Sequence, residues 1–173
     1  MNETVLEALR TRRSVKSYEN RPVAENQLKA ALEAATYAPT GRNSQSPTLV
    51  VVQDKDTIAQ LSRMNAQIMG TESDPFYGAP VVVVIFGDPD CHTWMEDACL
   101  VAGNLMNGAH ASGLGSCWIH RARPMFESEE GKALMKKWSL KENLIGVANI
   151  IMGYQKDQPK PRVPRKEGYI KMV

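Results

Sequence analysis

The sequence predicts one domain that combines helices with a buried β-sheet. The chain has 173 residues, of which 43% are hydrophobic and 23% are charged, a balance typical of a single globular domain. Two runs rich in β-branched residues, 48–52 and 81–86, indicate buried strands. Apolar residues recur at helical spacing in 25–37 and 93–112. Together these observations favour a single core built from both kinds of element.

The first half of the chain is expected to alternate helices with loops. Residues 3–11 and 25–37 have apolar side chains at helical spacing, and Pro39 ends the second helix. The remaining predicted segments are a turn-rich loop at 40–47, the strand 48–52, a helix at 54–64 and a connection at 69–80 that contains two glycines and two prolines.

The second half begins with the clearest strand, 81–86. The helix predicted over 93–112 has apolar residues around most of its circumference, which favours either a helix central to a dimer or one in a deep core. Glycines at 113 and 115 end this helix. The remaining predicted elements are a strand at 117–120, a short helix within 125–138 and a last strand at 144–152.

Basic residues gather at both ends of the chain. Residues 156–173 contain six basic and two acidic side chains, a net charge of +4 within a whole-chain charge of +2. A second basic group lies within 10–16. Prolines at 159, 161 and 164 predict an extended tail that lies on a surface, such as that of another subunit. Two basic ends favour an anionic partner.

Several classes of protein are disfavoured. The longest apolar run, 81–86, is far shorter than the ~20 residues that cross a bilayer, and residues 1–3 lack the features of a secretory signal. The three cysteines form no Cys-x-x-Cys pair and the three histidines are widely spaced, so no disulfide framework or metal site is expected. Aromatic content of 6% and a pI of 8.4 disfavour a nucleic-acid-binding module. We therefore expect a cytoplasmic protein.

Four segments could bind a ligand, and each also has a purely structural interpretation. Residues 12–16 place three cations and a hydroxyl together, which suits a phosphate, although basic residues after a helix also complement its dipole. The loop 39–45 offers amides to a polar heterocycle, or simply connects a helix to a strand. The glycines in 113–116 admit a flat ligand, or cap a helix. The basic segment 161–166 could bind an anion or be a disordered end.

Taken in order, these segments resemble the nitroreductase family of flavin mononucleotide (FMN) enzymes over nearly the whole chain. The motifs that carry the resemblance are Arg12-Arg13-Ser14-Val15-Lys16-Ser17-Tyr18, Ala38-Pro39-Thr40-Gly41-Arg42-Asn43-Ser44-Gln45, Phe76-Tyr77-Gly78-Ala79-Pro80, Glu96-Asp97-Ala98, Asn104, Ala109-His110, Gly113-Leu114-Gly115-Ser116-Cys117-Trp118-Ile119, Gly153-Tyr154 and a basic Pro-Arg-Lys near the end. The resemblance implies an α+β fold, with a mostly antiparallel central sheet flanked by helices, in an intertwined homodimer.

The same resemblance implies the chemistry. FMN would be the bound cofactor and NADH or NADPH the electron donor, with a nitroaromatic, quinone or similar small molecule as acceptor in a ping-pong cycle. The chain contains no Gly-x-Ser-x-Gly motif, and its cysteines lie in apolar stretches. The cofactor is therefore expected to carry the reaction, and no side chain is assigned as catalytic acid or base.

By this resemblance the cofactor-binding residues come from both subunits. Arg12, Arg13 and Ser14 would hold the ribityl phosphate and the pyrimidine edge. Lys16 would lie beside N1 and O2 of the flavin ring, where its charge would raise the reduction potential. The other implied contacts are Pro39, Thr40, Gly41, Asn43 and Gln45 of the other subunit, Asn65 near the pyrimidine edge, Leu114, Gly115 and Ser116 along the ring, and Arg165 and Lys166 at the phosphate. The tail, about 154–173, would pack on the partner subunit.

The sequence departs from the family pattern at three places. Lys16 stands where an arginine is common, and Gln45-Ser46-Pro47-Thr48 stands where Gln-Pro-Trp is common. Little chain lies between Met64 and Pro80 to form a substrate lid, which predicts an open acceptor site. The same pocket would also serve a protein that stores or senses flavin, or a flavin reductase, dehalogenase or oxidase.

Overall fold

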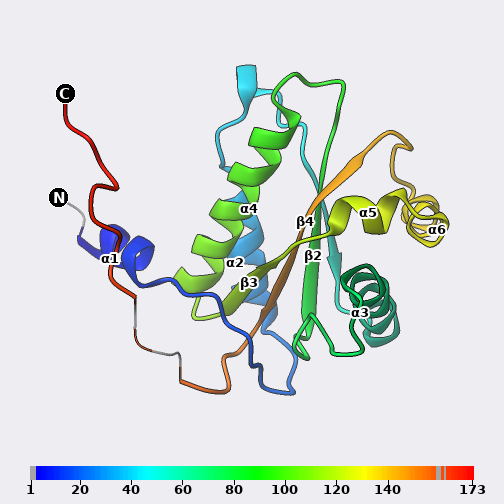
Figure 1. Cartoon of the computed structure of the whole chain (residues 1–173), viewed down its shortest axis with the longest axis horizontal. Coiled ribbons are helices and arrows are strands. Elements are labelled where there is room, and N and C mark those ends of the chain that lie inside the picture. The colour runs from blue at the N-terminus through cyan, green and yellow to red at the C-terminus, as the bar shows by residue number, and fades with distance from the viewer. Residues whose placement is uncertain (1–2, 159–160, 162) are drawn as a thin grey trace.

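A central antiparallel sheet organises the computed structural model, which describes residues 3–158, 161 and 163–173 (Figure 1). Within these residues the strands are β1 (Thr48–Val52), β2 (Val81–Gly87), β3 (Gly115–Ile119) and β4 (Ile145–Gly153). Their order is β1-β2-β4-β3, and each neighbouring pair is antiparallel. The predicted α+β class with an antiparallel sheet is therefore confirmed.

Helices cover both faces of this sheet (Figure 1). One face carries α2 (Glu25–Thr36) and α4 (Trp94–Ala111), and the other carries α3 (Lys55–Met69), α5 (Ala122–Glu127) and α6 (Glu129–Lys137). Successive side chains of a strand point to opposite faces. Val82 and Val84 of β2 accordingly pack in the cluster with α3, α5 and α6, whereas Val81 and Val83 pack in the cluster with α2 and α4. The prediction of a buried strand at 81–86 is confirmed.

The long helix α4 is buried on one face only. Ala98 and Leu105 are fully buried against the sheet and α2, but Met95 and Leu100 are 37% and 47% exposed. Of the two interpretations of this apolar helix, a deep-core position is therefore wrong for the single chain. A helix whose second apolar face is left open fits the other interpretation, in which a second subunit covers it.

Two predicted helices differ from the observed ones in length or number. The helix expected at 54–64 continues to Met69 and ends at Gly70, whose φ of 72° provides a left-handed cap. The helix expected within 125–138 is two helices, α5 and α6. Ser128, whose ψ of 159° is extended rather than helical, separates the two helices. Its hydroxyl accepts a hydrogen bond from the Gly131 amide at 3.1 Å and so caps the start of α6.

The first helix and the described residues of the C-terminal tail lie side by side, away from the sheet (Figure 1). Helix α1 (Glu3–Thr11) contacts α4, and a groove between α1 and the tail is lined by Leu9, Arg10, Val163, Pro164 and Arg165. The described residues beyond 155 form no helix or strand. Pro159 and Arg162, on which the extended-tail and basic-tail predictions partly rest, lie outside the described residues.

Within the described ranges, no helix combines the length and the apolar character needed to cross a membrane.

Candidate functional site

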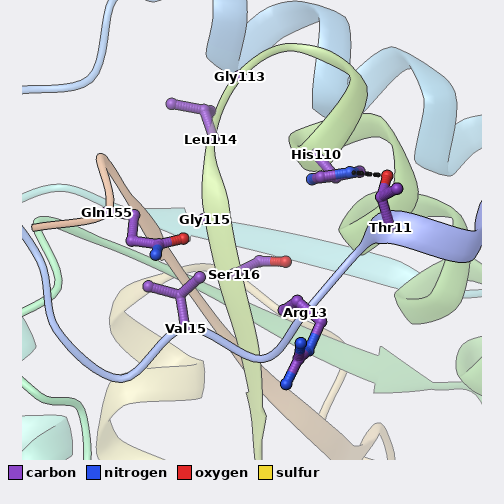
Figure 2. Close-up of a pocket in the computed structure, with 9 residues that line it drawn as sticks. All are labelled: Thr11, Arg13, Val15, His110, Gly113, Leu114, Gly115, Ser116 and Gln155. Carbon is purple, nitrogen blue, oxygen red and sulfur yellow. Dashed lines mark hydrogen bonds between the residues drawn. The ribbon is translucent and has the colours of Figure 1, made fainter. Parts of the chain in front are cut away.

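A cavity of about 270 Å³ lies where the segment after α1 passes the start of β3 (Figure 2). Its walls come from the end of α1, the end of α4, the turn into β3 and the residue after Tyr154. The lining residues are Thr11, Arg13, Val15, His110, Gly113, Leu114, Gly115, Ser116 and Gln155. Two of the predicted ligand-binding segments, 12–16 and 113–116, therefore meet at one place.

Backbone pairing brings these two segments together. Ser14 and Ser116 form an isolated parallel bridge, in which the Val15 amide donates to the Ser116 carbonyl at 3.0 Å. The approach requires glycine at 115, because a Cβ there would lie 2.8 Å from Cγ2 of Val15. Gly113, with a φ of 80°, ends α4 and turns the chain toward this edge. The glycines that sequence analysis linked to a flat ligand thus have a demonstrable steric role.

One polar group of the cavity wall and one in the adjoining basic segment lack a protein partner. Nη1 of Arg12 and the hydroxyl of Ser116 are buried, and neither makes a hydrogen bond within the part of the chain that the structure describes. Leaving a buried donor unpaired costs about 1 to 3 kcal/mol, so such groups point to a ligand. No acidic residue is among the described residues that line the cavity, whereas Arg13 is one of them. These groups suit an anion with several oxygen acceptors.

The groups that influence the Cys117 thiol show that the basic segment lies close to β3. The pKa of the Cys117 thiol is raised, chiefly by burial, while the nearby Ser14 hydroxyl and the charges of Lys16 and Arg12 act in the opposite direction. Lys16 itself is exposed, with Nζ 5.6 Å from the centre of the Tyr77 ring. Both cations therefore lie close to the start of β3, and Nη1 of Arg12 is buried.

The predicted loop 39–45 lies at the opposite end of α4 (Figure 1). It contains the short helical turn η1 (Gly41–Asn43), and Arg42, Asn43 and Gln45 all have positive φ angles. The Gly41 amide donates to Asp97 at 2.9 Å. His110, at the cavity, is thirteen positions after Asp97 in α4, which is about 20 Å at 1.5 Å per residue. The loop does not reach the cavity of its own chain.

Asp97 holds this loop in place. Its side chain is buried and accepts hydrogen bonds from the Gly41 amide, from the Ser44 hydroxyl at 3.3 Å and from the Thr93 hydroxyl at 3.0 Å. The Thr40 hydroxyl accepts a further bond from the Gln45 amide at 3.0 Å. Pro39, Asn43 and Gln45 are left exposed. The loop thus has a fixed backbone and presents a polar outer surface.

Asn65, Arg165 and Lys166 do not line the cavity of their own chain either. Asn65 is fully buried in α3, where Nδ2 donates to the His120 carbonyl at 2.8 Å and Oδ1 accepts from Arg121 at 3.0 Å. Arg165 lies beside α1, and Nζ of Lys166 lies 5.5 Å from the centre of the Tyr169 ring. A role of these residues in cofactor binding stays a prediction.

The cofactor contacts assigned from sequence leave out five of the lining residues, of which Val15 and Gly113 nevertheless lie inside the candidate segments 12–16 and 113–116. The five are Thr11, Val15, His110, Gly113 and Gln155. Val15, His110 and Gly113 lie inside motifs that were noted as family-like, so a signal was present. Thr11 reaches the cavity edge through a 2.8 Å hydrogen bond with Nε2 of His110, and Gln155 reaches it by pairing with Tyr18. Those contacts are tertiary, and no local pattern predicts them.

The described part of the chain contains no group of three or more His, Cys, Asp or Glu side chains placed to hold a metal ion.

Comparison with known proteins assigns the family. The model of the nitroreductase family matches residues 9–75 and 67–154. The chain is 27% identical to an FMN reductase [NAD(P)H] of Bacillus subtilis, over 96% of this chain and 72% of the relative. The same fold occurs in a nitroreductase with bound FMN from Bacteroides fragilis, with a TM-score of 0.90, 24% identity and complete coverage of both chains.

A second solved structure agrees. An FMN-dependent nitroreductase from Clostridium difficile has a TM-score of 0.77 and 27% identity, with 91% of each chain covered. The motifs around the cavity and these matches indicate the same family. The chain belongs to the nitroreductase family.

Proposed function

We propose that this protein is an FMN-dependent oxidoreductase that takes hydride from NADH or NADPH and reduces nitroaromatics, quinones or similar small molecules in a ping-pong cycle. Membership of the nitroreductase family supports this proposal. So do the bound FMN of the Bacteroides fragilis structure and the donor named for the Bacillus subtilis relative.

The observation that carries the proposal is the pair of unpartnered buried groups, Nη1 of Arg12 and the Ser116 hydroxyl. Ser116 lines the cavity, and Arg12 lies in the chain between the lining residues Thr11 and Arg13. FMN offers a phosphate with several oxygen acceptors and a flat ring. The guanidinium groups fit the first feature, and the backbone of residues 113–116, which forms one wall of the cavity, fits the second.

Each residue at the site then has a physical task. When bound, FMN supplies the hydride chemistry. Arg12, Arg13 and Ser14 would hold the phosphate and the pyrimidine edge, and Leu114, Gly115 and Ser116 would form the wall along the ring. The charge of Lys16 would stabilise negative charge on the reduced cofactor. Asn65, Arg165 and Lys166 belong to the same proposed set.

We further propose that the functional unit is a homodimer. The loop 39–45 is held rigid by Asp97, yet it lies about 20 Å along α4 from the cavity of its own chain. A second copy packed on the open face of α4, around Met95 and Leu100, would bring the partner's loop to this cavity. Pro39, Thr40, Gly41, Asn43 and Gln45 would then contribute to the partner's site, and the tail would pack on the partner.

The segment between α3 and β2 determines how much chain is available to cover the site where the electron acceptor would bind. Only residues 70–80 lie between these elements, and they form no helix or strand. The chain therefore offers little material here for a lid over the cofactor. We expect an open acceptor site that admits several small aromatic or quinone acceptors.

An anaerobic titration tests the proposal. Purified protein would be reconstituted with FMN and titrated with NADPH and then NADH, while the visible flavin band is followed. We expect the band to bleach with at least one donor. Parallel lines in double-reciprocal plots with a nitroaromatic or quinone would then support the ping-pong cycle. Bound FMN that resists both donors would instead favour flavin storage or sensing, and failure to bind FMN would refute the cofactor assignment.

A further inference from the structure

The side chain of Gln27, on α2, connects two segments that line the cavity. Its Nε2 donates to the Ser112 carbonyl at 2.6 Å, and its Oε1 accepts from the Tyr154 hydroxyl at 2.5 Å. Ser112 directly precedes the lining turn 113–116, and Tyr154 directly precedes the lining residue Gln155. One amide group thus ties two walls of the cavity together from behind.

The turn after α4 depends on this contact. The last carbonyls of a helix lack partners within the helix, and Gln27 supplies a donor for that of Ser112. The Leu114 amide closes the turn on the Ala109 carbonyl at 2.8 Å. A Cβ on Gly113 would lie 3.4 Å from Nε2 of Gln27, so the amide packs against the turn as well as bonding to it. The direction in which residues 113–116 enter the cavity wall is set at this point.

Tyr154 is itself held firmly on its other sides. The guanidinium carbon of Arg21 lies 3.4 Å from the centre of the Tyr154 ring. The Ala24 amide donates to the Tyr154 hydroxyl at 3.2 Å, and the Tyr154 carbonyl accepts from the Glu19 amide at 2.9 Å. The hydroxyl therefore has a fixed position from which it donates to Gln27.

We infer that Gln27 and Tyr154 are positioning residues that set the spacing between the turn 113–116 and Gln155, and through it the fit of the cofactor. Neither residue lines the cavity, so both act through backbone that does. This inference rests on the proposed function, in which the cavity holds FMN. It assigns a role in cofactor binding to two residues outside the contact set.

The test compares Gln27→Met, Tyr154→Phe and the double variant with the wild-type protein. Each single variant removes hydrogen bonds of this link, and we expect the dissociation constant of FMN to rise about three- to tenfold. The visible absorption band and the midpoint potential of bound FMN should shift. Because both variants break one shared link, the double variant should be no weaker in binding than the weaker single variant.

A matched control is available on α3. Gln60→Met also removes an amide hydrogen bond, that of Nε2 to Glu130 at 2.7 Å, but lies away from the cavity. It should bind FMN with the wild-type constant and spectrum.

The outcomes separate the inference from the function on which it rests. A wild-type protein that binds no FMN overturns the proposed function and the inference with it. Variants that lose thermal stability but keep the wild-type dissociation constant, band position and potential overturn the inference alone, because their link would then be merely structural. If Gln27→Met does not fold, Tyr154→Phe, which removes a single hydroxyl, carries the test.

Discussion

Asp97, in the first turn of α4, accepts a hydrogen bond from the backbone amide of Gly41 at 2.9 Å. The contact joins the start of the central helix to a loop whose residues Arg42, Asn43 and Gln45 have positive φ angles. Such conformations cost about 1 to 3 kcal/mol each for non-glycine residues and persist only where the surroundings fix them. The buried carboxylate is therefore what keeps this loop in its shape.

Replacing Asp97 by asparagine should lower the free energy of unfolding by about 1 to 3 kcal/mol, because an amide nitrogen would then face donors that now share a carboxylate. Urea unfolding followed by circular dichroism measures the change. Asp90→Asn is the control, since the Asp90 side chain is 67% exposed and its ion pair with Lys141 lies on the surface. Equal stability of Asp97→Asn and wild type would contradict the anchoring role.

Gly115→Ala should weaken FMN binding at least tenfold, roughly the effect of about 1.4 kcal/mol. The new Cβ would lie 2.8 Å from Cγ2 of Val15 and push apart the two segments that form the cavity. A flavin titration by fluorescence measures the dissociation constant. The double variant Gly115→Ala with Val15→Gly removes Cβ, Cγ1 and Cγ2 of Val15, all of which the new Cβ would meet, and should recover much of the affinity. No recovery would show that the steric argument is wrong.

Lys16→Met should lower the midpoint potential of bound FMN by a few tens of millivolts, because a cation near the reduced cofactor stabilises its negative charge. Spectroelectrochemistry measures the potential. Lys16→Arg keeps the charge and should remain close to wild type, as should Lys29→Met, which removes a surface cation paired with Glu25. An unchanged potential in Lys16→Met would remove this role from Lys16.

The raised pKa of Tyr18 predicts that the protein loses stability at alkaline pH. Burial is the main cause that raises the pKa of Tyr18, whose hydroxyl donates to the Val15 carbonyl at 2.7 Å. A raised pKa in the folded state means that the stabilisation is complete below the unfolded value of about 10 and falls as the pH rises above it. Urea unfolding at pH 8, 10 and 11 should show this loss.

Two variants isolate the contribution of Tyr18 to that loss. Tyr18→Phe should be less stable than wild type at pH 8 but should decline less between pH 10 and 11. Tyr169→Phe, in which an exposed ring is changed, should follow the wild-type decline. Parallel declines in all three proteins would mean that Tyr18 does not titrate on unfolding in this range.

Leu100→Asp should convert the proposed dimer into a monomer with weakened FMN binding, because Leu100 lies 47% exposed on the open face of α4. Light scattering coupled to size-exclusion chromatography gives the mass. Ile68→Asp is the matched control, since Ile68 is 43% exposed on α3. A wild-type protein that is monomeric at all concentrations, yet binds FMN, would refute the dimer.

The sequence predicts most elements because their patterns are local. The strand at 81–86 needed only its run of valines, and the helix 25–37 needed only its spacing and Pro39. The break at Ser128 was missed, although Ser-Glu-Glu-Gly is a recognisable helix start. The exposed face of α4 could not be predicted from periodicity, since an apolar face looks alike whether its own chain or another covers it.

The candidate site was predicted in part for the same reason. Residues 12–16 and 113–116 carry compact motifs, and the structure brings them together. Gln155 and Gln27 carry no local signal, because one is placed by strand pairing and the other by side-chain contacts across the fold. The resemblance supplied the expectation that loop 39–45 serves another subunit, and no spacing in the sequence would have indicated it.

The two halves of the proposed site, the cavity and the loop 39–45, lie at opposite ends of α4. This placement determines what happens when two different mutant chains form a heterodimer. A chain altered at Gly115 would have a defective cavity but an intact loop 39–45. A chain altered at Asp97 would have an intact cavity but a defective loop. A heterodimer of the two would unite both defects in one site and leave the other with every wild-type residue. Two inactive alleles expressed together would therefore restore activity, which is complementation between mutations within a single gene.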